Sequence, residues 1–317
     1  MNKKGGSSLI RDYSFGPTRQ SGTWIGKKCE IKFLHDFPAM EKTEGLFVKQ
    51  LPDGNVIVGL ADTHNEVYSP SHPAVLPHGD QIVAQAFGEA IISATNETTT
   101  SIALRANKIL RAKLEAINRD RSGRLPLIDL NDAARIPGAA IIIIKTDIVA
   151  REVEILQTCD VGSIYELSCG YQITPYRNWQ VEQYHQEKIQ SLLVQTLGDK
   201  GIMWDKFFGF LSDSRRAVNN KSEEVVIFNG TAAFEDFASS QIIYGDLDCG
   251  VMLFSDGALP DSEAFSPKRD NLLCRYLINP DLEDFLVATR ESQRLLIDKS
   301  HIYGGIPEAS LVKIVRR

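Results

Sequence analysis

The sequence lacks the features of an exported, membrane-spanning or disulfide-linked protein. Its 317 residues include five cysteines, an odd number without CxxC or Cys/His ligand spacing, which predicts reduced thiols in a cytosolic protein. The start, MNKKGGSSLIRDYS, has no apolar signal core, and no run approaches the roughly 20 apolar residues that a membrane span requires. We therefore expect a cytoplasmic protein that does not bind membranes.

The chain also lacks an excess of positive charge. Its 35 Lys and Arg residues stand against 41 Asp and Glu residues, which gives a formal net charge of -6. A negative molecule repels a polyanion at long range, so we expect no nucleic-acid partner. One basic run is interleaved with apolar residues at helical spacing, which is typical of a solvated helix face rather than a binding strip. It consists of Arg105, Lys108, Arg111, Lys113, Arg119, Arg121 and Arg124.

No internal repeat, low-complexity tract or long Pro/Gly linker divides the chain. With 43% hydrophobic residues, a chain of this length can bury about three quarters of its unfolded surface. We predict a single domain over residues 1–317, with residues 1–30 as an N-terminal extension to which the pattern assigns no element. The polar stretch 211–224 is predicted to be a surface loop.

Short apolar runs rich in β-branched residues predict strands that are covered on both faces. They lie at residues 55–61, 139–149, 224–230, 249–255 and 309–315. Helical spacing of apolar residues predicts two helices between the first two runs, one after a cap at Asp80 and one over residues 103–117. Further helices are predicted over 180–198 and 281–299. This order favours antiparallel sheets with helices packed outside them.

The segment EGLFVKQLPDGNVIVGLAD, residues 44–62, has a Pro-Asp-Gly turn between two strands, which predicts a hairpin. Glu44 and Asp62 each stand nine residues from Asp53 in the turn. Symmetric pairing would place their Cβ atoms about 5 Å apart. Two carboxylates so close repel each other unless a cation or a shared proton offsets the repulsion. The pair therefore predicts a hard divalent metal such as Mg²⁺ or Mn²⁺, provided that the register does not slip.

A second apolar run, in VMLFSDGALP at residues 251–260, also ends on a carboxylate, Asp256. Taken alone, Asp62 or Asp256 could accept backbone N–H groups in a turn. Two strands that both end in a carboxylate, together with Glu44, favour a metal site. Ser255 has no visible His/Asp partner arrangement and is interpreted as structural.

Three histidines follow Asp62 closely: His64, His72 and His78. A zinc cluster is one interpretation of them. Their spacing matches no zinc pattern, so ordinary surface histidines are the expectation.

In their order and spacing, the segments from about residue 40 onward resemble the metal-dependent protein phosphatase 2C family. The corresponding segments are LADTHNE (60–66), the helix pair (80–120), PGAAIIII (137–144), CDVGSIYEL (159–167), LFSDGAL (253–259) and PEASLVKIV (307–315). The resemblance implies an α+β fold, namely an α-β-β-α sandwich of two mostly antiparallel sheets flanked by helices. Of the family motifs, Ser-Asp-Gly is intact.

The resemblance also implies roles for individual residues. Asp62 would bridge two metal ions, Thr63 would offer its backbone carbonyl where the family has a glycine, and Asp256 would hold one ion. Glu44 matches the second acid of the family's Asn-Glu-Asp stretch. An N-terminal arginine of the family binds substrate phosphate, and Arg11 or Arg19 is a candidate for that role.

The closing metal ligand of the family corresponds to Pro307, which leaves Glu308 as the adjacent acid. Neighbouring residues of a strand point to opposite faces, so Glu308 reaches the site only if the backbone bends before it. Gly304 and Gly305 make such a bend feasible.

The activity implied by the resemblance is that of a Ser/Thr phosphoprotein phosphatase, with a cognate kinase as a possible partner. Water activated by two Mg²⁺ or Mn²⁺ ions would attack phosphorus directly, with Asp62 and Asp256 as the catalytic acids. The lost glycines and Pro307 leave a second interpretation, a pseudophosphatase that binds or regulates without turnover. A third is a metal phosphoesterase acting on small molecules.

Overall fold

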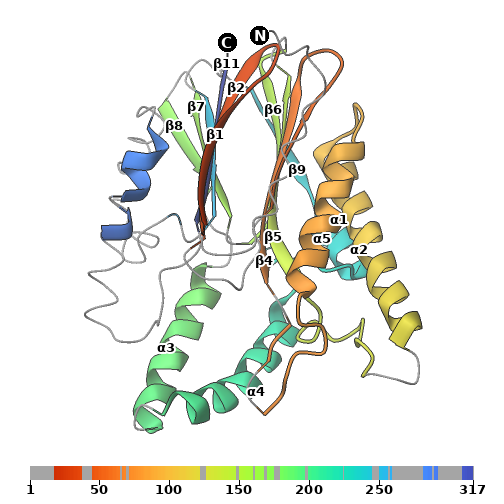
Figure 1. Ribbon diagram of the computed structural model, residues 1–317, viewed down its shortest axis with the longest axis vertical. Helices are drawn as coiled ribbons and strands as arrows, with labels where there is room; N and C mark the ends of the chain where they lie inside the picture. The colour runs from red at the N-terminus through yellow and green to blue at the C-terminus, as the bar shows by residue number, and fades with distance from the viewer. Residues whose placement is uncertain are drawn as a thin grey trace.

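Two antiparallel β-sheets face each other at the centre of the molecule, as a computed structural model shows (Figure 1). The structure describes residues 18–37, 45–64, 66–68, 71–121, 126–147, 150–159, 161–167, 170–174, 179–196, 199–223, 225–244, 250–255, 258, 281–287, 289–291 and 309–316. None of the helices in these ranges is both long enough and apolar enough to cross a membrane.

Within this part of the chain, sheet A has six strands in the order β1-β2-β11-β10-β7-β8, and sheet B has five in the order β3-β4-β5-β6-β9. Sheet A is formed by β1 (Thr18–Ile25), β2 (Cys29–Phe37), β7 (Gly162–Leu167), β8 (Gly170–Thr174), β10 (Val251–Phe254) and β11 (Ala309–Arg316). Sheet B is formed by β3 (Gly45–Gln50), β4 (Val56–His64), β5 (Gly138–Asp147), β6 (Glu152–Gln157) and β9 (Ser240–Tyr244).

Strand β4 explains why the central strands read as continuous apolar runs. Its residues Val58 and Leu60 belong to the core between the two sheets, whereas Ile57 and Ala61 belong to the core between sheet B and the helices. Because alternate side chains point to opposite faces, a strand covered on both sides needs apolar residues at every position.

Helices α1 (Gly79–Ser93), α2 (Thr99–Arg121) and the short α5 (Ala232–Phe237) lie on the outer side of sheet B (Figure 1). The ring of Phe87 on α1 packs against Phe47 of β3 at 5.9 Å and against Phe228 at 6.0 Å between ring centroids. Gly59 permits this close approach, since a Cβ atom there would come within 2.9 Å of Phe87 and Ile91.

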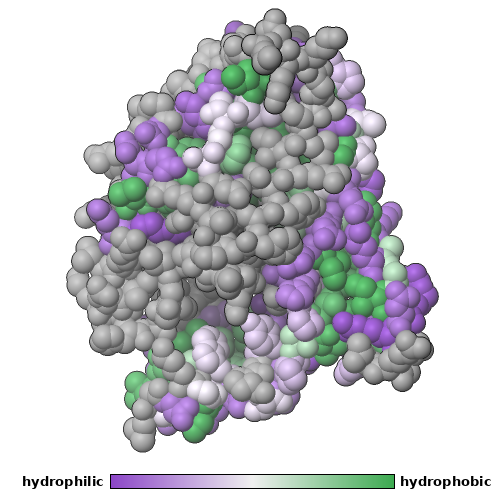
Figure 2. Space-filling model, in the orientation of Figure 1, coloured by the Kyte–Doolittle hydropathy of each residue, from purple (hydrophilic) through white to green (hydrophobic). Residues whose placement is uncertain are grey.

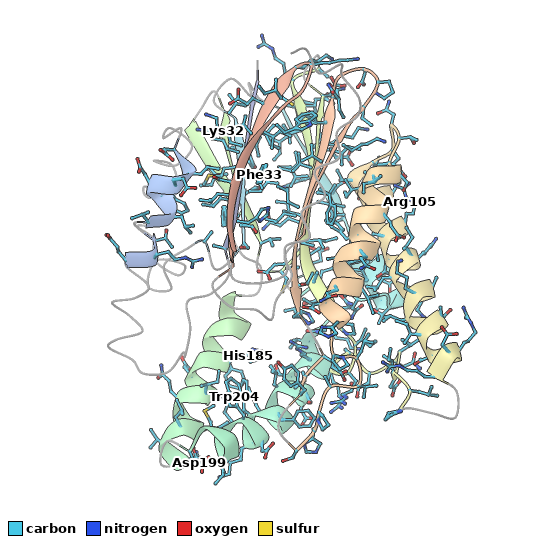
Figure 3. All side chains as sticks on the ribbon, in the orientation of Figure 1. Lys32, Phe33, Arg105, His185, Asp199 and Trp204 are labelled. Atoms are coloured by element: carbon cyan, nitrogen blue, oxygen red, sulfur yellow. The ribbon has the colours of Figure 1, made fainter. Side chains whose placement is uncertain are left out.

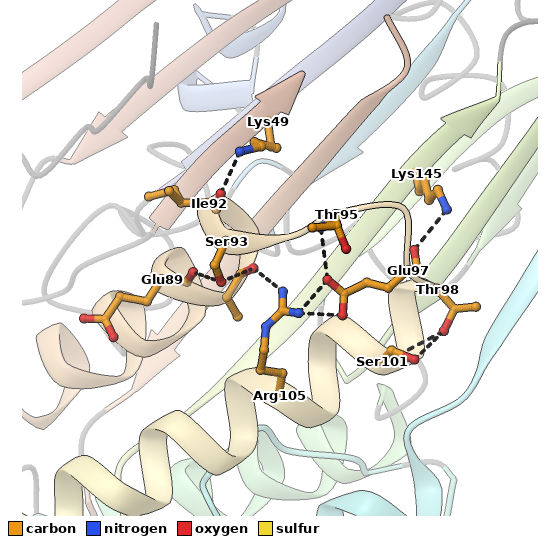
Figure 4. Close-up of polar contacts among 11 residues, drawn as sticks. Lys49, Glu89, Ile92, Ser93, Thr95, Glu97, Thr98, Ser101, Arg105 and Lys145 are labelled. Atoms are coloured by element: carbon orange, nitrogen blue, oxygen red, sulfur yellow. Dashed lines mark hydrogen bonds and ion pairs between the residues drawn. The ribbon is translucent and has the colours of Figure 1, made fainter. Parts of the chain in front are cut away.

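The turn between α1 and α2 is held by cations from α2, β3 and β5 (Figure 4). Lys145 of β5 donates to the carbonyl of Glu97 in this turn at 3.0 Å. Arg105 of α2 donates to the carbonyl of Ala90 at 2.6 Å and forms an ion pair with Glu97. Lys49 of β3 donates to the carbonyl of Ile92 at 2.9 Å. The last turn of α1 has no basic residue of its own, so these donors supply the positive charge that stabilises a helix C-terminus.

Other members of the basic run on α2 pair with neighbouring acids. Arg111 forms an ion pair with Glu115 at 2.7 Å, and Lys113 forms one with Glu89 at 2.8 Å. The run therefore behaves as the solvated helix face that was expected.

Helical residues 282–287 and 289–291 cover the outer side of sheet A. Their side chains Leu282, Phe285 and Leu286 pack against the sheet. The layers are thus helix, sheet A, sheet B and helix, which confirms the predicted α-β-β-α sandwich.

A second pair of helices, α3 (Trp179–Gln195) and α4 (Lys200–Val218), extends from one end of the sandwich (Figure 1). The pair has a small core of its own, formed by Ile189, Leu192, Met203 and Phe207. Asp199 caps α4, since its carboxylate accepts a hydrogen bond from the Ile202 N–H at 3.1 Å.

Two sequence-based expectations about helices were wrong in detail. The predicted surface loop 211–224 is helical as far as Val218, because its partly buried residues continue the packed face of α4. The N-cap of α1 is His78 rather than Asp80, which lies in the first turn.

The predicted strand 224–230 is also corrected. Its residues 225–228 are buried, but they contribute a single bridge, from Phe228 to Ala139, rather than a strand. In contrast, residues 18–25 and 29–37, where the pattern predicts no element, form the paired strands β1 and β2.

Candidate functional site

Strand β4 ends beside the start of β5. His64 lies opposite Gly138, and Asp62 lies opposite Ala140. In the preceding hairpin, Gly45 lies opposite Ala61, so the described register is symmetric about the turn, as the predicted carboxylate pair requires. The start of β3, the end of β4 and the start of β5 therefore share one end of sheet B.

The chain crosses from sheet B to sheet A at this same end. Near the start of β5, Ile142 lies opposite Gln157, the last residue of β6. A short connection then leads to β7, and the Gln157 side chain donates to the Val161 carbonyl across it at 2.7 Å. Strand β7 begins at Gly162.

Gly162 in turn lies opposite Phe254, the last residue of β10, and Phe254 lies opposite Leu311 near the start of β11. The end of the sandwich at which β4 ends is consequently the end at which β10 ends and β11 begins. We call it the β4 end of the sandwich.

Asp62 faces the layer between the sheets. It has the same strand parity as Val58 and Leu60, which pack in the inter-sheet core. Its side chain is partly buried, whereas the next residue, Thr63, is buried and has the parity of the helix-facing residues.

Sheet A presents several buried polar side chains at the β4 end, and three of them lie side by side: His35 of β2, Ser310 of β11, and Ser255 directly after β10. Ser310 lies opposite His35 in the register, and the two side chains are joined by a hydrogen bond of 2.7 Å between Nδ1 and Oγ. The Ser310 N–H donates to Ser255 Oγ at 2.9 Å, and the Ser255 N–H donates to the Ser310 carbonyl at 3.1 Å. We call these residues the polar row.

Burial lowers the pKa of His35 to about 4. Its imidazole is therefore neutral near pH 7, one ring nitrogen carrying the proton and the other accepting. Neither His35 nor Ser310 was predicted from the sequence. Alternation along CEIKFLHDF could have found His35, since it follows Cys29, Ile31 and Phe33 on the inner face. Figure 3 labels Lys32 and Phe33, which have opposite parity in β2.

Most of the predicted ligands lie outside the described residues. These are Glu44, Asp256 and Glu308, and the phosphate-binding candidate Arg11 also falls there. The other candidate, Arg19, lies in β1 opposite Asp36.

The three histidines after Asp62 lie in different surroundings. The ring of His64 lies against Gly138, where an added Cβ atom would come within 3.1 Å of it. His72 is exposed and stacks on Phe208 of α4 at 4.3 Å between ring centroids. His78 is exposed and is the N-cap residue of α1.

The segment that follows β4 is anchored by the buried Glu66. One carboxylate oxygen accepts a hydrogen bond from the Leu76 N–H at 2.6 Å, and the other pairs with Arg135 at 3.2 Å. Burial raises the pKa of Glu66, while the Leu76 N–H and the guanidinium oppose that shift. Arg135 also donates to the Val67 carbonyl at 2.9 Å, so one guanidinium contacts both Glu66 and Val67.

The same segment contacts α4. Ser71 donates through its hydroxyl to Asp205 at 2.5 Å, and His72 stacks on Phe208. The guanidinium of Arg135 also lies over the ring of Phe208, 5.9 Å from its centroid. Figure 3 shows the hairpin of α3 and α4, with His185, Asp199 and Trp204 labelled.

The described part of the predicted ligand set is chemically suited to a hard cation. It comprises the carboxylate of Asp62 and the backbone carbonyl of Thr63, both oxygen donors of the kind that Mg²⁺ and Mn²⁺ prefer. Among the residues that the structure describes, no group of three or more His, Cys, Asp and Glu side chains could hold a metal ion. A complete site would therefore need acids from outside those ranges.

A polar groove of about 920 Å³ lies elsewhere, lined by α2, residues 129–133, the end of α4 and the start of α5. Asn220, Asn229 and Asn107 form its hydrogen-bonded wall, and none of the predicted site residues lines it. In the view of Figure 2, hydrophilic residues surround smaller hydrophobic areas over α1 and α2, and both kinds mix over α3 and α4.

Comparison with known proteins gives matches in structure but not in sequence. No family profile and no curated protein matches the chain. Among solved structures, RsbX in complex with magnesium is 10% identical with a TM-score of 0.49, covering 94% of this chain and 100% of its own. The serine/threonine phosphatase of S. agalactiae is 12% identical with a TM-score of 0.49, covering 91% and 100%.

A third match is the catalytic domain of the serine/threonine protein phosphatase PstP with two manganese ions. It is 12% identical with a TM-score of 0.46, covering 91% of this chain and 98% of its own. Two of these three structures are serine/threonine phosphatases, the class that the sequence resemblance indicated.

Proposed function

We propose that this protein is a metal-dependent protein serine/threonine phosphatase whose site lies at the β4 end of the sandwich. The observation that supports the proposal is the convergence of strand ends. Asp62 faces the inter-sheet layer at the end where β10 ends and β11 begins. In the sequence, Asp256 directly follows Ser255 and Glu308 directly precedes β11.

The proposed ligands are the side chains of Glu44, Asp62, Asp256 and Glu308 and the backbone carbonyl of Thr63. Bound divalent ions would lower the pKa of a water molecule and stabilise the charge on the phosphate oxygens. Asp62 would keep the ions oriented from sheet B, and the acids next to β10 and β11 would do so from sheet A. All of these donors are oxygen atoms, as Mg²⁺ and Mn²⁺ require.

The proposed substrate is a protein phosphorylated on serine or threonine, and the enzyme that supplies it would be a Ser/Thr kinase. The segment after β4 and helix α4 are joined by the Ser71–Asp205 hydrogen bonds. They would form a wall beside the site, against which a phosphoprotein could lie.

The test measures Mn²⁺ binding by calorimetry and the hydrolysis of phosphoserine and phosphothreonine peptides. Asp62→Asn should reduce both Mn²⁺ affinity and turnover strongly, because it removes the proposed bridging charge. Glu115→Gln is the matched control, since it removes a carboxylate from the exposed ion pair on α2. Equal turnover in wild type and Asp62→Asn would contradict the proposal.

Two other outcomes assign a different function. Binding of a phosphopeptide without turnover would favour the pseudophosphatase. This alternative is supported by Pro307 at the position of the closing acid. Turnover of nucleotides but not of phosphopeptides would favour a small-molecule phosphoesterase.

A further inference from the structure

The inner face of sheet A changes from apolar to polar toward the β4 end. Along β2, the inward residues Ile31 and Phe33 are followed by His35. Along β11, Val312 and Ile314 are preceded by Ser310. Along β10, Val251 and Leu253 are followed by Ser255. The three polar residues form the polar row, which crosses neighbouring strands β2, β11 and β10.

The polar row is deeply buried. Ser255 and Ser310 are 0% exposed and His35 is 2% exposed. Apolar side chains in their place would complete the core without the cost of burying polar groups. Each member of the row hydrogen-bonds to the next. These bonds hold neighbouring strands in a fixed relative position, which explains the buried polar residues better than core filling does.

The row also stands next to the ends of two strands that carry proposed ligands. Ser255 is followed by Asp256 in the sequence, and Ser310 comes two residues after Glu308. The two serines are joined by two hydrogen bonds between β10 and β11. The Ser310 N–H donates to Ser255 Oγ, and the Ser255 N–H donates to the Ser310 carbonyl. Lateral movement of one strand end relative to the other would break these bonds.

We infer that the polar row of His35, Ser310 and Ser255 fixes the ends of β10 and β11 relative to each other, and that metal binding by the proposed ligands next to these strands in the sequence depends on it. These are positioning residues, because they act through the proposed ligands. The inference rests on the proposed function for its metal and on the described hydrogen bonds for its geometry. Residues that orient metal ligands typically change metal affinity by about 10- to 100-fold when they are replaced.

The test compares three variants with wild type. Ser255→Ala removes the hydroxyl that accepts a hydrogen bond from the Ser310 N–H, which ties the end of β10 to the start of β11. His35→Leu/Ser310→Ala replaces both partners of the side-chain hydrogen bond with apolar groups, so that no single polar group is left unpaired by the change. Thr146→Val is the matched control, because Thr146 is also 0% exposed and bonds to Val56 from the neighbouring strand at the opposite end of the sandwich.

The first measurement is Mn²⁺ affinity by calorimetry, together with the thermal midpoint of the metal-free protein. Both polar-row variants should bind Mn²⁺ about 10- to 100-fold more weakly, and Thr146→Val should stay within about twofold of wild type. The double variant should keep a thermal midpoint close to that of wild type, which separates positioning from stability. Equal affinity in Ser255→Ala and Thr146→Val would overturn the inference.

The second measurement is hydrogen exchange in the metal-free protein. Exchange of the backbone amides at positions 255 and 310 should accelerate in both polar-row variants, Ser255→Ala and the double variant, and stay unchanged in Thr146→Val. If wild type binds no Mn²⁺, the proposed function fails and this measurement alone decides the inference. Unchanged protection of the two amides would then overturn it.

Discussion

The two helical hairpins of the molecule differ in how they are attached. The hairpin of α1 and α2 shares one core with sheet B, in which Phe87 and Ile91 of α1 pack among residues from β3, β4 and β5. The hairpin of α3 and α4 has its own small core. Among the described residues, it contacts the rest of the protein mainly through side chains at the surface, such as Asp205, Phe208 and Arg216.

Because of this difference, the two helical hairpins should contribute unequally to the free energy of unfolding of the protein. Loss of packing in α1 removes contacts from the main core, so it should lower the free energy of unfolding of the whole domain. Loss of packing in α4 should open a local unit first, because that unit shares few buried contacts with the rest. Its exposed apolar residues Tyr184, Val194, Ile202 and Trp204 fit that description.

The largest expected effect is that of Phe87→Ala. The ring is 0% exposed and packs between Phe47 and Phe228. Its removal should lower the free energy of unfolding by about 3–5 kcal/mol, through lost burial and the cavity left behind. Denaturation in urea, followed by fluorescence and circular dichroism, measures this change.

Phe207→Ala is the counterpart in the small core of the second hairpin. It should increase hydrogen exchange throughout α3 and α4 while the main urea transition moves much less than in Phe87→Ala. If Phe87→Ala and Phe207→Ala shifted the main urea transition equally, both hairpins would unfold together with the sheets. That result would contradict the proposed difference between them.

Two helical glycines sharpen the same comparison at smaller scale. A Cβ atom at Gly88 of α1 would lie 2.2 Å from Cε1 of Phe47, whereas one at Gly209 of α4 would meet nothing within 4 Å. Gly88→Ala should therefore destabilise the domain by about 1–3 kcal/mol through overpacking. Gly209→Ala should stabilise α4 by up to about 1 kcal/mol through helix propensity. Thermal unfolding of Gly88→Ala and hydrogen exchange of α4 in Gly209→Ala measure the two changes in stability. If both variants were destabilised, or both stabilised, the contrast between the two glycines would be contradicted.

The smallest expected effect is a pH dependence of the second hairpin. Burial, with a contribution from Arg215, lowers the pKa of His185 from 6.5 to about 4. Between these values the unfolded hairpin binds a proton that the folded one does not. Stability from neutral His185 is therefore complete above pH 6.5 and is lost as the pH falls toward 4. Hydrogen exchange in α3 and α4 should rise over that window.

His185→Gln provides the control for this effect. Glutamine can still bond to Ser214, the present partner of the imidazole at 2.8 Å, but it does not titrate. The variant should lose the local acid response while the sandwich keeps the response that arises from His35, whose pKa is also lowered to about 4 by burial. An identical acid response of the hairpin in the variant would contradict the role of His185.

Local pattern predicted the β3–β4 hairpin well. The Pro-Asp-Gly turn around Asp53 fixes the register that places Gly45 opposite Ala61, because a short turn leaves few alternatives. The apolar runs of β4, β5, β10 and β11 were found for a similar reason, since strands covered on both faces must be apolar throughout. The edge strand β9 was missed, since its exposed Ile242 and Tyr244 do not form such a run.

Local pattern failed where burial depends on distant partners. Residues 225–228 have the composition of a strand, yet only Phe228 pairs with another segment, at Ala139. Leu211 and Ser214 look like part of a polar loop in the sequence, yet they continue α4 against its neighbours. In both cases the tertiary environment overrode the local preference.

The sequence by itself determined the layered α+β architecture, the β3–β4 register and the carboxylate at the end of β4, because these depend on alternation and turn chemistry within short segments. Only the tertiary structure decided that β4, β10 and β11 meet at one end and that His35 reaches Ser310 across 275 residues of chain. The register of strands so far apart is set by the pairing of the whole sheet, and a shift by one residue would turn every side chain to the other face.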